Sequence, residues 1–322
     1  MPSKHVIPLE DVSCPLCGLK KEMPILKTCD INSGIPGEYN VSKCLNCGMC
    51  YLNPRPTALG LSEVYPEVYA RNYIEQVPRW VPQRISFLRK IKSTGRLLEI
   101  GCSAGHFLNV ARKMGYDVTG IEMDKRTAQY AKEHYGLEVK TAPLEDVNLP
   151  EAYFDLVVFF DVFEHLRDPI VSLEKIFKAL IPNGYVIIKV PNFSCLESKL
   201  VGSLWYPLDL PRHLLHFSPI TLTKMLTNAG FSSIRILHQS ESYSFFYSMG
   251  RWILSAFGKR YGTAMAVQTG DAGCVIRAIR ALSYKKKKII CQAISLLWLL
   301  PGRALAMFKQ GNAITVIAQK SR

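Results

Sequence analysis

The chain has 322 residues, of which 48% are hydrophobic and 20% are charged, and this composition excludes a disordered, collagen-like or fibrous repeat protein. At about 100 to 200 residues per domain, the length predicts two domains or one large domain with an appendage. Basic residues outnumber acidic ones by 40 to 26, but residues 1–242 carry 27 basic and 25 acidic residues, whereas residues 243–322 carry 13 basic residues and only Asp271. A near-neutral body disfavours a protein that coats nucleic acid.

The N-terminal segment carries two Cys-x-x-Cys-Gly pairs, at Cys14 and Cys17 and at Cys44 and Cys47. Each pair predicts a tight turn whose glycine lets backbone N–H groups face the thiolates, and the two turns together predict a four-sulfur zinc ribbon. Such a site has no open coordination position, so we expect a structural zinc ion. The alternatives are redox-active pairs, ordinary buried cysteines, or an iron–sulfur site, because Cys50 extends the second pair to C-x2-C-x2-C.

The first twelve residues lack the basic start and apolar run of a secretion signal. We therefore expect a cytoplasmic protein with reduced thiols, which suits metal ligation. The ribbon is followed by Tyr51–Pro56, whose two prolines predict a stiff, extended connection. The first domain boundary is expected near residue 56.

From residue 96 the chain alternates short β-like runs with helical periods, which predicts a doubly wound, mainly parallel α/β sheet. Ligands bind such sheets beyond the carboxyl ends of the strands, so the residues that follow each strand are the informative ones. We expect strands at residues 97–101, 117–122, 154–160, 185–190, 233–238 and 313–319, with helices near 106–114, 126–135 and 170–181.

Glycines and acidic residues stand where the first two strands end. Gly101 permits a sharp turn, and Gly105 lets the next helix begin close to a ligand. Glu122 follows the second strand, where a carboxylate can accept hydrogen bonds from both ribose hydroxyls of a nucleotide. A dinucleotide such as NAD or FAD is the competing ligand, but the E-x-G-x-S-x-G pattern that begins at Glu99 differs from G-x-G-x-x-G.

Five stretches carry a resemblance to a known family, and they span most of residues 14–240. They are the two cysteine pairs with Tyr51–Pro56, then Leu98–Gly105, Gly120–Glu122, Phe163–Pro169 and Leu210–Pro219. Together they resemble the class I S-adenosylmethionine-dependent methyltransferases, and within them the bacterial quinone-methyltransferase-like branch with an N-terminal four-cysteine ribbon. Ser103 departs from the middle glycine that is most common in this family.

The resemblance implies a seven-stranded, Rossmann-like methyltransferase sheet, with a small zinc ribbon before it and a helical insertion before its last strand. It implies S-adenosylmethionine as cofactor, with its methionine part near Glu99, its ribose near Glu122 and its adenine edge near Leu144. The full set of expected cofactor contacts is Glu99, Gly101, Cys102, Ser103, Gly105, Glu122, Met123, Leu144, Glu145 and Asp161.

Methyl transfer to an acceptor also requires a nearby base that removes a proton. His165 follows the strand expected at residues 154–160, and its alternative role is a local hydrogen bond at a helix start. His213 and His216 follow the strand expected at residues 185–190 and a lid-like, aromatic and proline-rich loop. Alternatively, His213 and Arg212 only anchor this loop to the sheet. The expected catalytic residues are therefore His213, His216 and His165, with Asp161, Glu164, Asp209 and Arg212 as further polar groups beside them.

The basic excess lies in an insertion before the last strand. It contains two apolar stretches, Tyr243–Phe257 and Ile289–Phe308, and each is interrupted before it reaches the ~20 residues of a membrane span. Lys285–Lys288 and scattered aromatic residues predict peripheral contact with an anionic membrane surface, and the alternative is a helical pair packed on the sheet or a dimer contact. The expected domains are a zinc ribbon over 1–56, the cofactor-binding core over 57–242 plus 310–322, and the basic apolar insertion over 243–309.

The resemblance implies methyl transfer to a small-molecule or glycan acceptor, such as a sugar hydroxyl in bacterial surface-polysaccharide synthesis, including lipid-linked glycans. A second hypothesis is ribosomal RNA methylation with the ribbon gripping RNA, which the near-neutral residues 1–242 disfavour. A third is a non-catalytic scaffold, which the intact Glu99, Gly101 and Glu122 disfavour.

Overall fold

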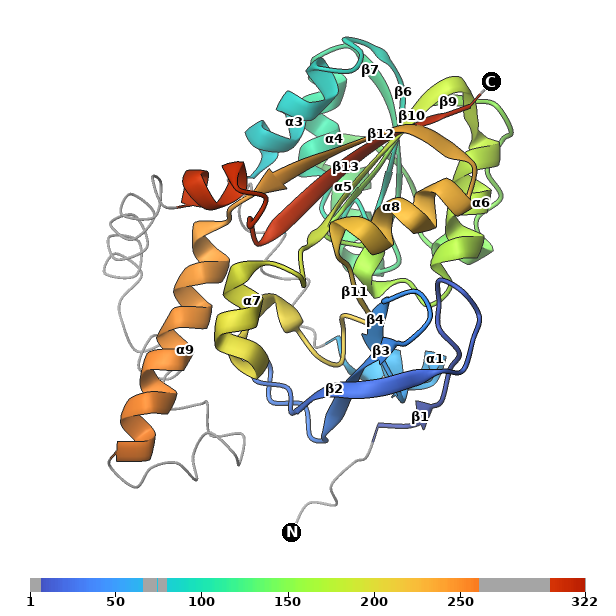
Figure 1. Ribbon diagram of the computed structural model, residues 1–322. Coiled ribbons are helices and arrows are strands. Elements are labelled where there is room, and N and C mark those ends of the chain that lie inside the picture. Colours follow the sequence, from blue (N-terminus) through green and yellow to red (C-terminus); the bar gives the residue numbers. More distant parts are fainter. Residues whose placement is uncertain (1–6, 66–73, 75–79, 261–301, 322) are drawn as a thin grey trace. The chain divides into compact units, whose positions relative to one another are not determined.

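The computed structural model describes residues 7–65, 74, 80–260 and 302–321 (Figure 1). The chain divides into two compact units. We call Met1–Val64 with Pro191–Thr221 and Leu237–Ile314 the ribbon unit, and Tyr65–Val190 with Leu222–Ile236 and Thr315–Arg322 the sheet unit. The domain boundaries expected from the sequence stay predictions.

The sheet unit is built on a seven-stranded sheet, which confirms the predicted α/β fold class. Its strand order is β12-β13-β10-β9-β6-β7-β8, and the pairs β10 with β9, β9 with β6, β6 with β7 and β7 with β8 are parallel. The strands are β6 (Gly95–Ile100), β7 (Tyr116–Ile121), β8 (Glu138–Lys140), β9 (Phe154–Phe160), β10 (Leu180–Pro191), β12 (Phe231–Gln239) and β13 (Ala313–Lys320).

Two strands differ from the prediction. β8 was not predicted, because its three residues include Glu138 and Lys140 and show no apolar run. β10 begins earlier than expected, at Leu180, which pairs with Phe154 before a register shift that ends at Tyr185. Every residue of the central strand β9 is buried, as expected for a strand with both faces covered.

The helices of the sheet unit begin and end at local signals in the sequence. The Asp124 carboxylate accepts from the backbone N–H groups of Arg126 and Thr127 at the start of α5, and Gly136 ends that helix with a φ of 60°. Pro169 begins α6 at the position where a missing N–H costs nothing. The helices are α3 (Val81–Arg89), α4 (His106–Lys113), α5 (Lys125–Tyr135), α6 (Pro169–Ala179) and α8 (Pro219–Asn228).

The ribbon unit contains a four-stranded antiparallel sheet in the order β11-β4-β3-β2, and a two-stranded pair of β1 (Leu9–Glu10) with β5 (Arg55–Pro56). β11 comes from a distant part of the chain and pairs Leu215 with Tyr51 and His216 with Cys50. The segment expected to form a lid therefore contributes a strand to the ribbon. The four strands are β2 (Glu22–Thr28), β3 (Tyr39–Cys44), β4 (Cys50–Leu52) and β11 (Leu215–His216).

The start of the insertion is helical, as predicted, in α9 (Ser242–Arg260). The buried Glu197 carboxylate of α7 (Leu196–Val201) accepts hydrogen bonds from the hydroxyls of Ser244 and Ser248 at 2.9 and 2.8 Å and from the Asn312 amide at 2.7 Å, which fixes α9 within the ribbon unit. Lys285–Lys288 lie outside the described residues. Among the helices that the structure describes, none is both long and apolar enough to cross a membrane.

Candidate cofactor site and metal centre

The turn after β6 uses three residues with a left-handed backbone. Gly101, Ser103 and Gly105 have φ values of 70°, 48° and 75°. The Gly101 and Cys102 N–H groups both donate to the Ile121 carbonyl, at 2.8 and 3.1 Å, so the turn is held against the end of β7. A Cβ on Gly101 would lie 2.5 Å from the Val162 side chain, so only glycine fits there.

Gly105 has a packing role that the sequence did not indicate. A Cβ at this position would lie 2.6 Å from Leu137 Cδ1 and 2.9 Å from Ala131 Cβ, so the glycine allows α4 to start close to α5 and the chain that follows it. The expected contact of Gly105 with the cofactor stays a prediction.

Glu122 connects the ends of the first two strands. One carboxylate oxygen accepts from the Ser103 N–H at 2.7 Å, and the other accepts from the Asp124 N–H at 2.8 Å. Burial raises the pKa of Glu122, while these two backbone hydrogen bonds oppose the rise. Because the backbone N–H of Ser103 makes the contact, a serine can replace the glycine more common at this position.

Glu99 lies within β6 and is 2% exposed. Its Oε2 has no hydrogen-bond partner among the described residues. Burial raises its pKa to about 8, against the opposing charge of Arg84 and with a smaller contribution from the charge of Glu122. Such a buried oxygen requires a cation or an N–H donor as its partner, and the ammonium group of S-adenosylmethionine is both.

The remaining expected cofactor contacts differ in exposure. Leu144 is buried in a single turn of 3-10 helix, Leu144–Asp146, whose Leu144 and Glu145 carbonyls accept from Lys175 Nζ at 2.8 and 2.6 Å. Cys102 is buried, and Met123 is 64% exposed. Cys102 and Met123 follow closely after the ends of β6 and β7, and Leu144 follows β8. The predicted cofactor contacts of these residues stay predictions.

The four predicted metal ligands lie together in the ribbon unit. Their sulfur atoms all lie within 4.8 Å of one another, with Cys14 Sγ to Cys47 Sγ at 3.4 Å and Cys17 Sγ to Cys44 Sγ at 3.6 Å. Four sulfurs at about 2.3 Å from one zinc ion in a tetrahedron are about 3.8 Å apart, so the residues present fit the metal.

Both cysteine pairs sit on the predicted turns. Gly18 and Gly48 have φ values of 73° and 78°, and each donates its N–H to the carbonyl of the first cysteine in its pair, at 2.9 and 3.0 Å. The Cys50 thiol does not belong to the four-sulfur group and lies 3.8 Å from the Gly48 carbonyl. This arrangement favours the four-sulfur ribbon over the iron–sulfur alternative.

Comparison with known proteins agrees with this geometry. The sequence profile of the methyltransferase domain family, Methyltransf_23, matches residues 69–236, which is more than half of the chain. The chain belongs to the class I S-adenosylmethionine-dependent methyltransferases. The predicted family and cofactor class are thereby confirmed.

The methyltransferase is similar to several curated proteins. It is 29% identical over 183 residues to a probable S-adenosylmethionine-dependent methyltransferase of Mycolicibacterium smegmatis, covering 56% of this chain and 68% of that protein. It is 23% identical over 168 residues to a ubiquinone biosynthesis O-methyltransferase of Bradyrhizobium diazoefficiens, covering 50% of this chain and 66% of that protein. The chain thus spans about two thirds of the length of these relatives.

Among solved structures, phosphoethanolamine N-methyltransferase 2 of Haemonchus contortus in complex with S-adenosyl-L-methionine has a TM-score of 0.52 and 14% identity, covering 94% of this chain and 69% of that chain. At this level of identity the likeness shows a shared fold. It supports the seven-stranded, Rossmann-like sheet of the methyltransferase.

Asp161 is an ion-paired residue rather than a free carboxylate. Its oxygens accept from Lys189 Nζ at 2.8 and 3.1 Å and from the Arg84 guanidinium at 2.6 Å. Burial alone would raise the pKa of Asp161, but the charges of Lys189 and Arg84 lower it, so the group is a weak base. Sequence reasoning missed both partners; the only signal was a lysine inside the apolar run of β10.

His165 lies in a single 3-10 turn, Phe163–His165, next to the buried Glu164. Its Nδ1 is 3.0 Å from the Tyr65 hydroxyl, a contact that comes from 100 residues away in the chain. The histidine therefore does make a hydrogen bond, as its alternative role requires, but the partner is distant in sequence.

The histidines near β11 belong to the ribbon unit. His213 Nδ1 is 2.8 Å from the Pro207 carbonyl. His216 is 4% exposed, and burial, with the charge of His213 adding to it, lowers its pKa to about 3. A histidine this difficult to protonate is poorly suited to accept a proton near neutral pH, which argues against His216 as the base.

The contacts of Arg212 fit the alternative role of this segment, which is that of an anchor. Its guanidinium pairs with Asp30 at 3.3 Å and with Asp209 at 2.6 Å, and it is 1% exposed. The anchor joins the segment to the ribbon, whereas the sequence suggested the sheet. The sequence could not predict this partner, because Asp30, which supplies the second carboxylate, lies 182 residues from Arg212 in the chain.

The high pKa of Glu99 predicts a pH-dependent stability. Between about pH 4.5 and pH 8 the folded protein holds a proton on Glu99 that the unfolded chain has released, so this residue lowers the free energy of unfolding as pH rises through that window. Each pKa unit corresponds to about 1.4 kcal/mol. In urea unfolding at pH 5 and pH 9, Glu99→Gln is expected to gain stability relative to wild type at pH 9, and an equal difference at both pH values would contradict the assignment.

Proposed function

We propose that the protein transfers a methyl group from S-adenosylmethionine to a small-molecule or glycan acceptor. The observation that carries the proposal is the pair of buried carboxylates at adjacent strand ends, Glu99 with an unpartnered oxygen and Glu122 held by two backbone N–H groups. The chain's membership of the methyltransferase family and its fold support the assignment of these two carboxylates to cofactor binding.

Each carboxylate has a distinct role in the proposal. Glu99 binds the ammonium of the methionine part, because its buried oxygen has no other partner among the described residues. Glu122 accepts hydrogen bonds from the ribose hydroxyls, and the Ser103 and Asp124 N–H groups hold its carboxylate in position. The cofactor supplies an electrophilic methyl group on a sulfonium, so the chain mainly has to align donor and acceptor and exclude water.

A hydroxyl acceptor also loses a proton, and we propose His165 or His213 as the base, ahead of His216. His165 Nδ1 contacts the Tyr65 hydroxyl and His213 Nδ1 contacts the Pro207 carbonyl, and such a contact orients an imidazole and selects its tautomer. His213 Nε2 also lies 3.8 Å from the Asp209 carboxylate. Asp161 takes part by fixing Arg84 and Lys189 at the end of β9 rather than by accepting the proton.

The acceptor is proposed to be a hydroxyl compound, because relatives are named ubiquinone biosynthesis O-methyltransferases. A sugar hydroxyl in surface-polysaccharide synthesis is the specific substrate class that we propose. The net positive charge of residues 243–322 supports action at an anionic membrane face or on a phosphate-bearing acceptor.

The four-cysteine group is proposed to bind one structural zinc ion. The sulfur separations match a tetrahedral site, and a shell of four thiolates leaves no position for a substrate. Zinc would stabilise a ribbon whose strands are short and whose own apolar core is small.

The proposed reaction is tested by incubating the purified protein with methyl-labelled S-adenosylmethionine and a bacterial lysate. Label is expected in the soluble-sugar or lipid fraction, because the acceptor is proposed to be a small molecule or glycan. A Glu122→Ala protein added to a parallel sample is the control and should transfer little label. Label confined to RNA or protein, or no transfer from a protein that binds the cofactor, would overturn the proposal.

A further inference from the structure

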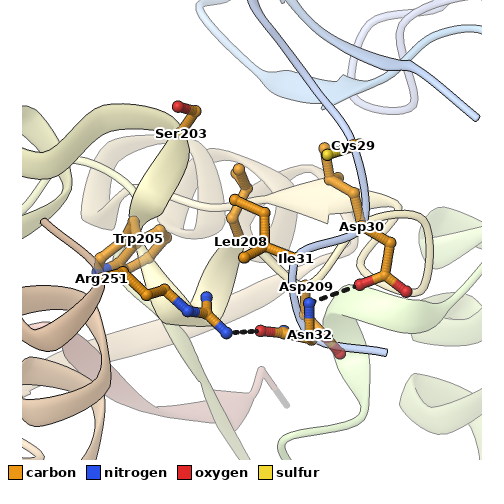
Figure 2. Close-up of a pocket in the computed structure, with 10 residues that line it drawn as sticks. Cys29, Asp30, Ile31, Asn32, Ser203, Trp205, Leu208, Asp209 and Arg251 are labelled. Carbon is orange, nitrogen blue, oxygen red and sulfur yellow. Dashed lines mark hydrogen bonds between the residues drawn. The ribbon is translucent and has the colours of Figure 1, made fainter. Parts of the chain in front are cut away.

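The ribbon unit contains a second feature that the proposed reaction does not use. One hollow is lined by residues 29–32 of the ribbon, by Arg251 of α9, and by Ser203, Trp205, Leu208, Asp209 and Leu210 (Figure 2). All of these residues belong to the ribbon unit. They come from three distant parts of the sequence, so no motif marks the hollow.

Arg251 is the notable charge in this hollow. Figure 2 shows its guanidinium directed at Asn32, whose Oδ1 accepts a hydrogen bond at 2.5 Å. The guanidinium also lies 5.1 Å from the centre of the Tyr206 ring. Within the described part of the chain, no carboxylate oxygen lies within 4.0 Å of Arg251, although a guanidinium offers five N–H donors.

The two acidic residues of the hollow are already engaged elsewhere. The Asp30 carboxylate accepts from the N–H groups of Asn32, Ser33 and Ile35 and pairs with Arg212. The Asp209 carboxylate accepts from Arg212 and from the Asn32 amide. Toward the residues that the structure describes, Arg251 therefore has donors without an acceptor.

Asn32 holds this arrangement in place. Its amide nitrogen donates to Asp209 and to the Tyr206 carbonyl, at 3.3 Å for the latter, which leaves its Oδ1 turned to Arg251. Burial lowers the pKa of the Arg251 guanidinium, while the charges of Tyr206 and Asp209 oppose the change. The partly buried cation is thus oriented by Asn32.

Aromatic rings stand beside the charge. Tyr206 and Tyr247 have ring centres 5.0 Å apart at an angle of 34°, and Tyr243 contacts both rings. Tyr243 is 53% exposed. A cation next to an aromatic surface suits a ligand that combines an anionic group with a ring.

We infer that this hollow is a binding site for an anionic ligand group, a phosphate or a carboxylate, which Arg251 binds through its guanidinium. The Tyr206 ring beside the guanidinium offers an aromatic surface next to the charge. The inference goes beyond the proposed function, because it assigns a ligand site within the ribbon unit alone.

Isothermal titration calorimetry of the full-length protein with pyrophosphate and with malonate tests the inference. Wild type is expected to bind at least one of them, and Arg251→Gln to weaken that binding by about tenfold or more, because a charge-assisted bidentate contact is lost. Arg251→Lys keeps the charge and is expected to fall between the two. Arg303→Gln is the matched control, because Arg303 is exposed, and it should bind as wild type does.

The comparison of the two probes separates a phosphate site from a carboxylate site. S-adenosylhomocysteine is titrated into the same samples, and unchanged affinity in Arg251→Gln shows that the variant is folded. Binding of neither anion by a wild type that binds S-adenosylhomocysteine would overturn the inference alone, as would equal anion affinity in Arg251→Gln. A wild type that binds no S-adenosylhomocysteine would instead refute the proposed function.

Discussion

A variant with Cys14→Ser and Cys17→Ser is expected to contain no stoichiometric zinc and to lose the ordered ribbon. The two residues supply half of a four-sulfur group whose members all lie within 4.8 Å of one another. A hydroxyl is a poor zinc ligand compared with a thiolate, and structural zinc contributes on the order of 10 kcal/mol to folding in small zinc-binding peptides. This is the largest stability effect that we expect from any change in the chain.

Elemental analysis of the purified protein measures the zinc content, and amide hydrogen exchange measures the order of β2 and β3. Exchange in both strands should become fast in the variant, because the short strands lose the metal that links the two cysteine turns. Cys29→Ser is the matched control, since Cys29 lies in the same unit but outside the four-sulfur group, and it should retain one zinc ion. One zinc ion per chain in the double variant would refute the metal centre.

Replacing Glu122 is expected to have the largest effect on cofactor affinity. Glu122→Ala removes the acceptor proposed for the ribose hydroxyls and also removes the partner of the Ser103 and Asp124 N–H groups. At about 1.5–3 kcal/mol for each hydrogen bond to a charged group, the affinity for S-adenosylhomocysteine should fall by about 100-fold or more.

Calorimetric titration of S-adenosylhomocysteine measures this loss. Glu122→Gln keeps one acceptor oxygen and the side-chain size, so its affinity should lie between those of wild type and Glu122→Ala. Glu138→Ala is the control, because Glu138 is an exposed carboxylate on the neighbouring edge strand β8, and it should bind as wild type does. An affinity unchanged by Glu122→Ala would remove Glu122 from the cofactor site.

Several features of the cofactor region could be predicted because their signals are local. The strand β9 matches its predicted range residue for residue, since its seven consecutive, mostly apolar residues are followed by the charged Asp161. Glu99 and Glu122 were identified by their positions at successive strand ends, and the structure brings Ser103 and Glu122 into contact across 19 residues. The strand and the two acidic positions could be predicted because they depend on the order of residues along the chain.

Other features depend on side chains that are far apart in the chain. Arg84 pairs with Asp161 from 77 residues away and converts a candidate base into an ion-paired group. His216 belongs to a two-residue strand that pairs with Tyr51 and Cys50, far away in the chain, and burial of the histidine lowers its pKa. No local pattern distinguishes such a buried histidine from a catalytic one.

The sequence by itself determined the cysteine turns, the order of strands and helices, and the acidic residues at the strand ends. Spacing and periodicity encode them, because neighbouring residues decide turns and the hydrophobic faces of strands and helices. Only the tertiary structure decided which charges meet: Arg212 with Asp30 across 182 residues, and Arg251 with Asn32 across 219. Such pairs arise when packing brings distant segments together. The basic excess of residues 243–322 suggested an anionic partner, but only the folded chain indicates Arg251 as the residue that could bind it.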